Sequence, residues 1–214
     1  GFLHRLGELI AADADTLAKL MTREQGKPVS EARGEILKLA DACHFYAEEA
    51  TRIHGETVPN DSNDFDSIVV REPLGVVAAI TPWNYPAELV GWKLCGALAA
   101  GCTIVIKPAE ITPFTALAIG RKCLDAGMPP GVVNVITGPG SVVGQALVEH
   151  KGIDKIAFTG SSAVGLHIQR SAANIKRMTL ELGGNCPMSV TQSADLAAAI
   201  KGATRRAFRN CGQI

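Results

Sequence analysis

The sequence predicts an α/β protein built on a doubly wound parallel sheet. Short apolar segments with strand character recur along the chain, for example at 76–80 and 103–107, and helical segments of about a dozen residues separate them. That alternation is typical of a parallel sheet with helices on its faces. With 214 residues, of which 47% are hydrophobic and 20% charged, the chain has a globular composition and can bury a sizeable core.

The N-terminal part is expected to be helical before the first strands appear. Apolar residues recur at helical spacing in two stretches, and the turn sequence Gln25-Gly26-Lys27-Pro28 separates them. Acidic and amide residues then mark a loop. The expected elements are two helices, a loop and two strands, at 6–21, 30–53, 59–67, 68–70 and 76–80.

The rest of the chain alternates between helices and strands. Pro86 stands at a first-turn position, and Thr112-Pro113 is a cap residue followed by a first-turn proline. The expected helices are 86–99, 113–125, 141–149, 162–173 and 195–208. The expected strands are 103–107, 132–136, 155–158, 178–181 and 188–190.

Charge and hydropathy exclude several classes of partner. Lys and Arg (21) balance Asp and Glu (21), so there is no electrostatic case for nucleic acid or an anionic membrane. The most apolar stretch, 97–106, is broken by Gly101 and is too short to span a bilayer. A basic stripe on the last helix is interpreted as a solvated face or an inter-domain contact: Lys201, Arg205, Arg206 and Arg209.

The cysteines indicate a reducing compartment and no metal site. Six are scattered along the chain without a C-x-x-C motif or a paired histidine. Reduced thiols in the cytoplasm therefore fit better than zinc or disulfides. Gly1 does not resemble a natural start, so a targeting segment upstream stays open.

Residues that directly follow the strands are the first candidates for a site, because parallel sheets bind ligands at the carboxyl ends of their strands. Their convergence is a stronger indication than any one segment. Five such segments would lie on one rim of the sheet: Thr81-Pro82-Trp83-Asn84, Lys107-Pro108-Ala109-Glu110, Thr137-Gly138-Pro139-Gly140, Thr159-Gly160-Ser161 and Glu181-Leu182-Gly183-Gly184.

Two of these segments have the chemistry to bind a nucleotide. In the turn after Phe158, Gly160 and the free N–H groups of the next helix could bind a phosphate. Lys107 and Glu110 could hydrogen-bond ribose hydroxyls, and the carboxylate would repel a 2′-phosphate, which favours NAD over NADP. Each has a plainer interpretation, an ordinary strand–helix turn in the first case and a solvated ion pair in the second.

Two other rim residues could take part in catalysis. The amide of Asn84 could stabilise an oxyanion, or it could simply bond its own turn. Glu181 ends an apolar strand before two glycines. In a half-buried pocket its pKa would be raised and it could act as a general base, whereas the plainer interpretation is a helix-capping or ion-paired glutamate.

Taken jointly, these segments resemble the NAD(P)-dependent aldehyde dehydrogenase superfamily over the whole chain. Five motifs stand in family order, at 81–86, 107–110, 158–161, 181–185 and 208–213. The stretches 23–28 and 31–35, with the Phe-Arg-Asn start of the last motif, are most similar to the succinate-semialdehyde dehydrogenase branch. Cys186, Cys211 and Ser162-Ala163 depart from that branch and weaken the choice of substrate.

The resemblance implies a Rossmann-like coenzyme-binding domain at 1–53 and 74–183, with the start of an oligomerisation arm at 55–73. Residues 184–214 would open a catalytic domain. In the family the nucleophilic cysteine follows Gly-Gln-x, which here is the position after Ile214. The expected parent is thus a homo-oligomeric cytoplasmic enzyme, and the chain by itself is expected to be inactive.

Roles for the rim residues also follow from the resemblance. Asn84 would hold the oxyanion and Glu181 would activate water for deacylation, while Lys107 and Glu110 would hold the adenosine ribose of NAD. Ser161 would bind the pyrophosphate, and Phe158 and Leu182 would line the nicotinamide side. The remaining coenzyme contacts would be Ile80, Thr81, Pro82, Trp83, Gly140, Gly144, Gly160 and Val164.

Two functions from different classes remain open. The first is NAD-dependent oxidation of a small aldehyde, with succinate semialdehyde as one candidate. The second is a non-catalytic nucleotide-binding module. A CoA-acylating enzyme is disfavoured because Glu181 supplies a hydrolytic base, and Cys211 is disfavoured as the nucleophile because it precedes the Gly-Gln pair.

Overall fold

A five-stranded parallel sheet forms the centre of the molecule, as the sequence predicts. In the computed structural model, which describes all 214 residues, the strand order is β5-β4-β3-β6-β7. The chain winds outwards from the central strand in both directions, so the sheet is doubly wound. The strands are β3 (Val76–Ile80), β4 (Thr103–Lys107), β5 (Val133–Val135), β6 (Lys155–Thr159) and β7 (Arg177–Glu181).

The sheet buries both of its faces. In β3, Val77 and Ala79 pack into a cluster of 28 buried residues that includes α1 to α5. Ala78 and Ile80 pack into a second cluster of 8 buried residues with α6 and α7. Because successive side chains of a strand point to opposite faces, apolar residues at every position produce two cores.

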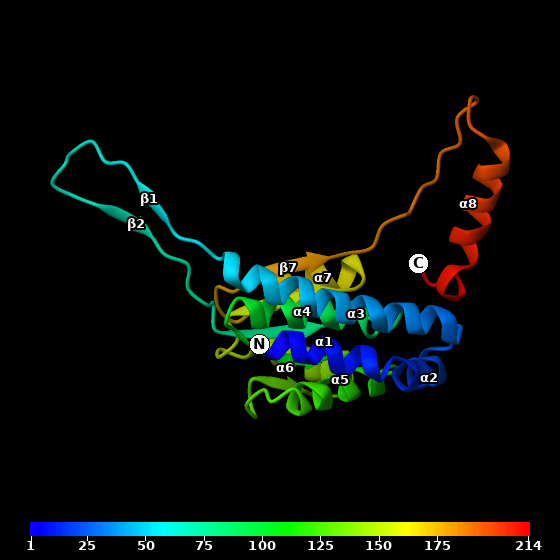
Figure 1. Cartoon of the computed structure of the whole chain (residues 1–214), viewed down its shortest axis with the longest axis horizontal. Coiled ribbons are helices and arrows are strands. Elements are labelled where there is room, and N and C mark those ends of the chain that lie inside the picture. Colours follow the sequence, from blue (N-terminus) through cyan, green and yellow to red (C-terminus); the bar gives the residue numbers. More distant parts are fainter.

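Five helices cover the first face (Figure 1). They are α1 (Phe2–Ala12), α2 (Ala14–Gln25), α3 (Val29–Glu49), α4 (Glu88–Ala99) and α5 (Phe114–Asp125). The predicted single helix at 6–21 is wrong, because the chain breaks at Asp13, whose carboxylate pairs with Lys122 of α5 at 3.0 Å. α2 ends at Gly26, whose φ of 93° is a left-handed conformation that glycine adopts readily.

The other face carries shorter elements. The expected helix at 141–149 begins as a π-helical turn, η2 (Gly140–Gly144), and continues as α6 (Gln145–Glu149). The helix after β6 is α7 (Ser162–Ser171). Both segments begin just beyond the carboxyl ends of β5 and β6. Parallel sheets bind ligands at this edge, so the first residues of η2 and α7 are available to a ligand.

Two segments leave the body of the molecule in opposite directions (Figure 1). One is an antiparallel arm of β1 (Glu56–Val58) and β2 (Ser67–Val69), which follows the short helix η1 (Ala50–Arg52). The other runs from β7 to α8 (Leu196–Phe208) and the final turn η3 (Arg209–Gly212). The predicted strand at 188–190 is wrong, because this exposed stretch crosses open space with no neighbouring strand to pair with.

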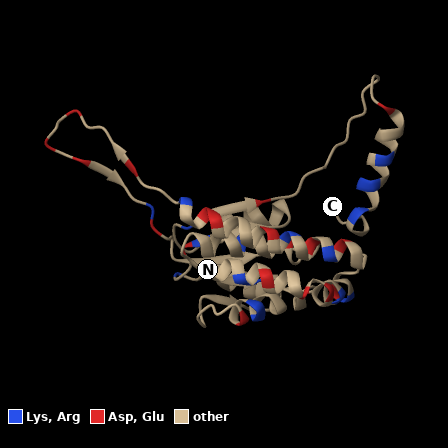
Figure 2. Cartoon of the chain, in the orientation of Figure 1, with Lys and Arg blue, Asp and Glu red and all other residues tan.

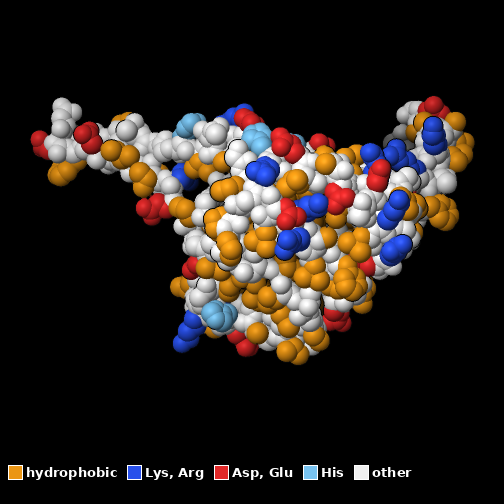
Figure 3. All heavy atoms as spheres, turned by 60° about the horizontal axis from the view of Figure 1, so that its bottom comes forward, with side chains coloured by type: hydrophobic (Ala, Val, Ile, Leu, Met, Phe, Trp, Pro, Cys, Tyr) orange, Lys and Arg blue, Asp and Glu red, His pale blue; other side chains and the backbone are white.

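The positions of basic and acidic residues are interspersed along the ribbon of the body (Figure 2). Apolar side chains lie among them and along the arm (Figure 3). None of the helices combines the length and the apolar character that a membrane crossing requires.

Candidate functional site

The strand register brings the predicted rim segments side by side. Ile80 pairs with Lys107 of β4 and with Phe158 of β6, and Thr159 pairs with Glu181 of β7. The ends of β6 and β7 are also joined by a backbone hydrogen bond of 3.1 Å from the Gly160 N–H to the Glu181 carbonyl. Side chains that follow four different strands therefore share one edge.

On the β4 and β5 side, the rim carries a buried lysine and an exposed carboxylate. Lys107 is 3% exposed, and its Nζ donates to the Pro108 carbonyl at 2.9 Å. Burial lowers the pKa of Lys107, and the charge of Glu110 partly opposes this effect. The Glu110 carboxylate accepts a hydrogen bond from the Gly140 N–H at 3.2 Å. This bond ties the segments after β4 and β5 together, and Gly144 ends the same turn.

The turn between β6 and α7 is packed around a glycine. A Cβ at position 160 would lie 2.5 Å from the Phe158 ring, so glycine lets this buried ring pack beneath the turn. Ser161 caps α7, because its Oγ accepts the N–H of the exposed Val164 at 3.3 Å. The positive end of the α7 dipole thus lies at the rim, which suits an anionic group.

The end of β3 supplies a buried hydroxyl. Thr81 is 4% exposed, and its Oγ1 has no hydrogen-bond partner. A buried polar atom of this kind calls for a partner outside the chain, such as a water or a ligand. The two residues after Thr81 are more exposed: Pro82 is half-buried and Trp83 is exposed. They therefore form the solvent-facing border of the site.

Asn84 lies where the rim meets the C-terminal segment. Its Nδ2 donates to the Gln213 carbonyl at 2.8 Å, so the amide does not simply bond its own turn. Its backbone carbonyl accepts hydrogen bonds from Lys27 Nζ at 2.9 Å and from Asn210 Nδ2 at 2.7 Å. Asn210 and Cys211 have φ angles of 53° and 56°, a left-handed conformation that costs backbone free energy in non-glycine residues.

Glu181 lies on the rim, but the expected half-buried pocket is wrong. The side chain is exposed, because β7 is an edge strand and the chain leaves the sheet soon afterwards (Figure 1). Leu182 turns back over α7, where a Cβ at Gly165 would lie 2.4 Å from the leucine side chain. The Glu181 carboxylate is thus accessible to water along the open side of the rim.

The structure adds Lys93 of α4 to the site. Its Nζ donates to the Thr159 Oγ1 at 2.6 Å. Burial lowers the pKa of Lys93 to about 8, and the charge of Glu181 raises it by a smaller amount. A lysine with a pKa of about 8 that senses the charge of a rim carboxylate is a candidate for proton transfer. Its sequence signal is a single charge in the otherwise apolar stretch 89–99.

The stability of the fold is expected to rise with pH through Lys93. The unfolded chain, with a pKa near 10.5, holds this proton more tightly than the folded chain, with a pKa of about 8. Raising the pH through this window therefore favours the folded state. Relative to Lys93→Met, the wild-type free energy of unfolding should increase by about 1 kcal/mol per pH unit.

Urea denaturation at about pH 7.5 and about pH 9.5 measures this effect. The difference between the two proteins cancels the titration of groups other than Lys93. A difference that stays constant between the two pH values would contradict a lowered pKa.

The fold and the rim define a doubly wound α/β protein with a ligand-binding edge at the carboxyl ends of its strands. All residues from 1 to 214 match the aldehyde dehydrogenase family. The chain therefore belongs to the aldehyde dehydrogenase family.

Individual proteins that are similar to this chain are also aldehyde dehydrogenases. The succinate-semialdehyde dehydrogenase [NADP(+)] GabD of Escherichia coli is 48% identical over 206 residues, which are 96% of this chain and 43% of that protein. The glutarate-semialdehyde dehydrogenase of Pseudomonas putida is 47% identical over 99% of this chain and 44% of its own length. The NAD+ complex structure of an aldehyde dehydrogenase from Bacillus cereus superimposes with a TM-score of 0.96 at 42% identity, covering 100% of this chain and 44% of that one. The chain spans less than half the length of these relatives.

Proposed function

We propose that this chain forms the coenzyme-binding part of an enzyme that oxidises a small aldehyde to its carboxylic acid with NAD. The observation that carries the proposal is the 2.8 Å hydrogen bond from Asn84 Nδ2 to the Gln213 carbonyl. It joins an amide on the sheet rim to the segment that, by family resemblance, directly precedes the nucleophilic cysteine. An oxyanion donor and a coenzyme-binding edge would then meet at one place.

The rim fits a dinucleotide. The buried Thr81 hydroxyl lacks a partner, Lys107 donates only to its neighbour's carbonyl, and α7 directs its positive end at the same edge. We assign Lys107 and Glu110 to the adenosine ribose and Ser161 to the pyrophosphate. The other proposed contacts are Phe158 and Leu182 on the nicotinamide side, with Ile80, Thr81, Pro82, Trp83, Gly140, Gly144, Gly160 and Val164 around them. When bound, NAD would supply the hydride acceptor.

The chain's own residues would act at two steps. Asn84 would donate through Nδ2 to the oxyanion that forms when a thiolate adds to the aldehyde carbonyl. Glu181 would take a proton from the water that attacks the resulting thioester. Cys211 is less suited to supply the thiolate, because its Sγ donates to the Gly26 carbonyl at 3.4 Å.

The division of the molecule supports the proposed domains. We assign 1–53 and 74–183 to the coenzyme-binding domain, 55–73 to an oligomerisation arm and 184–214 to the start of a catalytic domain, as the body, the arm and the C-terminal segment suggest (Figure 1). Exposed apolar side chains on the arm, such as Phe65 and Ile68, support a homo-oligomeric parent. Four of the six free cysteines are buried. We propose a cytoplasmic enzyme, because reduced thiols are typical of that compartment.

Aldehyde oxidation by a full-length enzyme that contains this sequence tests the proposal. Succinate semialdehyde, glutarate semialdehyde and an uncharged aldehyde of similar length are each incubated with NAD, and NADH absorbance is followed. We expect the highest kcat/KM with a semialdehyde that carries a carboxylate, because the relatives of E. coli and P. putida are named for such semialdehydes. No NADH with any aldehyde would overturn the proposed function.

The 214-residue polypeptide alone separates catalysis from nucleotide binding. It should bind NAD without forming NADH, because none of its thiols takes the proposed nucleophile position. NADH formation that disappears in Cys211→Ser would instead identify Cys211 as the nucleophile.

We expect the full-length enzyme to prefer NAD to NADP because of Glu110. Its carboxylate can accept from a ribose 2′-OH and repels a 2′-phosphate. Glu110→Gln should therefore improve kcat/KM for NADP relative to NAD by about tenfold, since removal of one like charge is worth on the order of one pKa unit of interaction. Steady-state kinetics with both coenzymes measure the ratio. A wild-type preference for NADP would contradict the role given to Glu110.

A further inference from the structure

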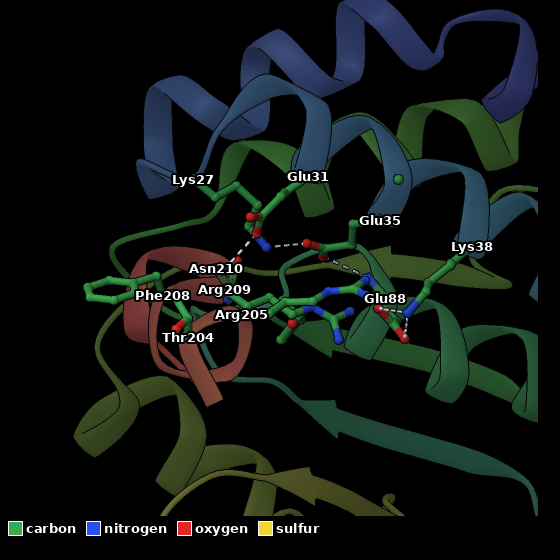
Figure 4. Close-up of a pocket in the computed structure, with 12 residues that line it drawn as sticks. Lys27, Glu31, Glu35, Lys38, Glu88, Thr204, Arg205, Phe208, Arg209 and Asn210 are labelled. Atoms are coloured by element: carbon green, nitrogen blue, oxygen red, sulfur yellow. Dashed lines mark hydrogen bonds and ion pairs between the residues drawn. The ribbon is translucent and has the colours of Figure 1, made fainter. Parts of the chain in front are cut away.

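We propose that the buried Lys27–Glu35 ion pair positions Asn84 for catalysis, an inference that rests on the oxyanion role proposed above for the Asn84 amide. Lys27 belongs to the turn between α2 and α3, and Glu35 belongs to α3. The two side chains point toward each other (Figure 4), and Lys27 Nζ also bonds the carbonyl of Asn84 in the turn from β3 to α4.

The pair is almost completely removed from water. Lys27 is 1% exposed and Glu35 is 3% exposed, and Lys27 Nζ bonds Glu35 Oε2 directly. Charges buried this deeply lose hydration free energy, and mutual attraction compensates for that loss only if the remaining donors and acceptors are also satisfied. The partners of those remaining atoms therefore indicate what the pair holds in place.

All of these partners lie in one short segment, 84–88. Lys27 Nζ donates to the Asn84 carbonyl at 2.9 Å and lies 4.3 Å from the centre of the Tyr85 ring. Glu35 Oε1 accepts from the N–H groups of Ala87 at 2.8 Å and Glu88 at 3.1 Å. The two side chains thus hold both ends of the turn between the rim and α4.

This turn has little support of its own. α4 has no side-chain cap from its own N-cap residue, so the Glu35 carboxylate takes that place at the positive end of the helix. The Asn84 carbonyl belongs to no strand pair, and side chains supply its hydrogen bonds. In addition to Lys27, Asn210 Nδ2 donates to it at 2.7 Å and Gln25 Nε2 at 3.4 Å. Fixing this carbonyl fixes the backbone from which the Asn84 side chain extends, while the amide itself bonds the Gln213 carbonyl.

The Lys27→Met variant of the full-length enzyme tests the role of the pair. It keeps a side chain of similar length but removes the donor to Asn84. We expect kcat to fall about tenfold and the NADH burst to slow by a similar factor, since small misplacements of a catalytic group have large effects on rate. The dissociation constant of NAD should change less than about twofold, because Lys27 lies outside the nucleotide contacts.

A second variant and a matched control keep the test decisive. If Lys27→Met does not fold, Lys27→Met combined with Glu35→Gln removes both charges, and the amide oxygen can still accept from Ala87 and Glu88. The control is Lys122→Met, which removes the pair between Lys122 of α5 and Asp13 at the start of α2 and no hydrogen bond of the turn at 84–88. It should affect thermal stability without changing kcat.

The decisive comparison repeats the Lys27 substitution in the Asn84→Ala background. If the pair acts through the Asn84 amide, the tenfold effect should shrink to less than about twofold there, because coupled residues are not additive. An equal loss in both backgrounds would show general support of the fold and overturn the proposal, as would an unchanged kcat in Lys27→Met. A wild-type enzyme that oxidises no aldehyde would instead overturn the proposed function.

Discussion

Replacement of Asn84 by alanine is expected to lower kcat of the full-length enzyme by about 10²–10³-fold, the usual effect of removing one oxyanion donor. The donor acts on charge that develops only in the transition state, so KM should change much less than kcat. The structure directs this amide at the Gln213 carbonyl rather than at its own turn, which leaves its geometry set by other parts of the chain. Stopped-flow measurement of NADH formation should show that the first step itself is slowed.

Asn134 provides a matched control for this experiment. Its Nδ2 donates to the Gly131 carbonyl at 2.8 Å, so this exposed amide only supports a local turn beside β5. Asn134→Ala should leave kcat unchanged within about twofold, as is usual for a surface substitution. A decrease below about threefold in Asn84→Ala would instead assign Asn84 a structural role in its turn.

The sheet could be predicted because its signals are local. The segment 76–80 is apolar at every position and 103–107 is apolar at its three central positions, and both form strands with these bounds. The common rim then follows from the rule that parallel strands end at the same edge. Glycine, cap residues and proline at the turns mark where each strand or helix ends, so few other assignments of the strands and helices fit the sequence.

Features that depend on contacts between distant segments could not be predicted in the same way. The Lys27–Glu35 pair becomes important only when α3 packs beneath the turn at 84–88, and nothing in a Gly-Lys-Pro turn indicates burial of its lysine. The strand expected at 188–190 has suitable residues but no neighbour to pair with. The sequence likewise predicts the strand that carries Glu181, but the exposure of this side chain depends on what packs against an edge strand.

Substitution of Glu181 by glutamine is expected to separate the two halves of the reaction. In the role proposed above, Glu181 is needed for attack of water on the thioester and not for formation of the thioester, so the NADH burst should persist. Steady-state turnover should fall by about 10²–10⁴-fold, the usual contribution of a positioned general base. Glutamine keeps the shape of the side chain and removes its negative charge, and with it the ability to take a proton.

An added nucleophile gives this prediction a second, independent readout. Hydroxylamine attacks a thioester without help from a protein base, so hydroxylamine added after the burst has consumed a limiting amount of aldehyde should release the acyl group from Glu181→Gln. Glu149→Gln is the matched control, because Glu149 on α6 is also exposed and its carboxylate only accepts from Gln145 at 2.6 Å. Loss of the burst together with turnover, without rescue by hydroxylamine, would place Glu181 in the first step or in the fold. Rescue with a full burst would assign it to deacylation.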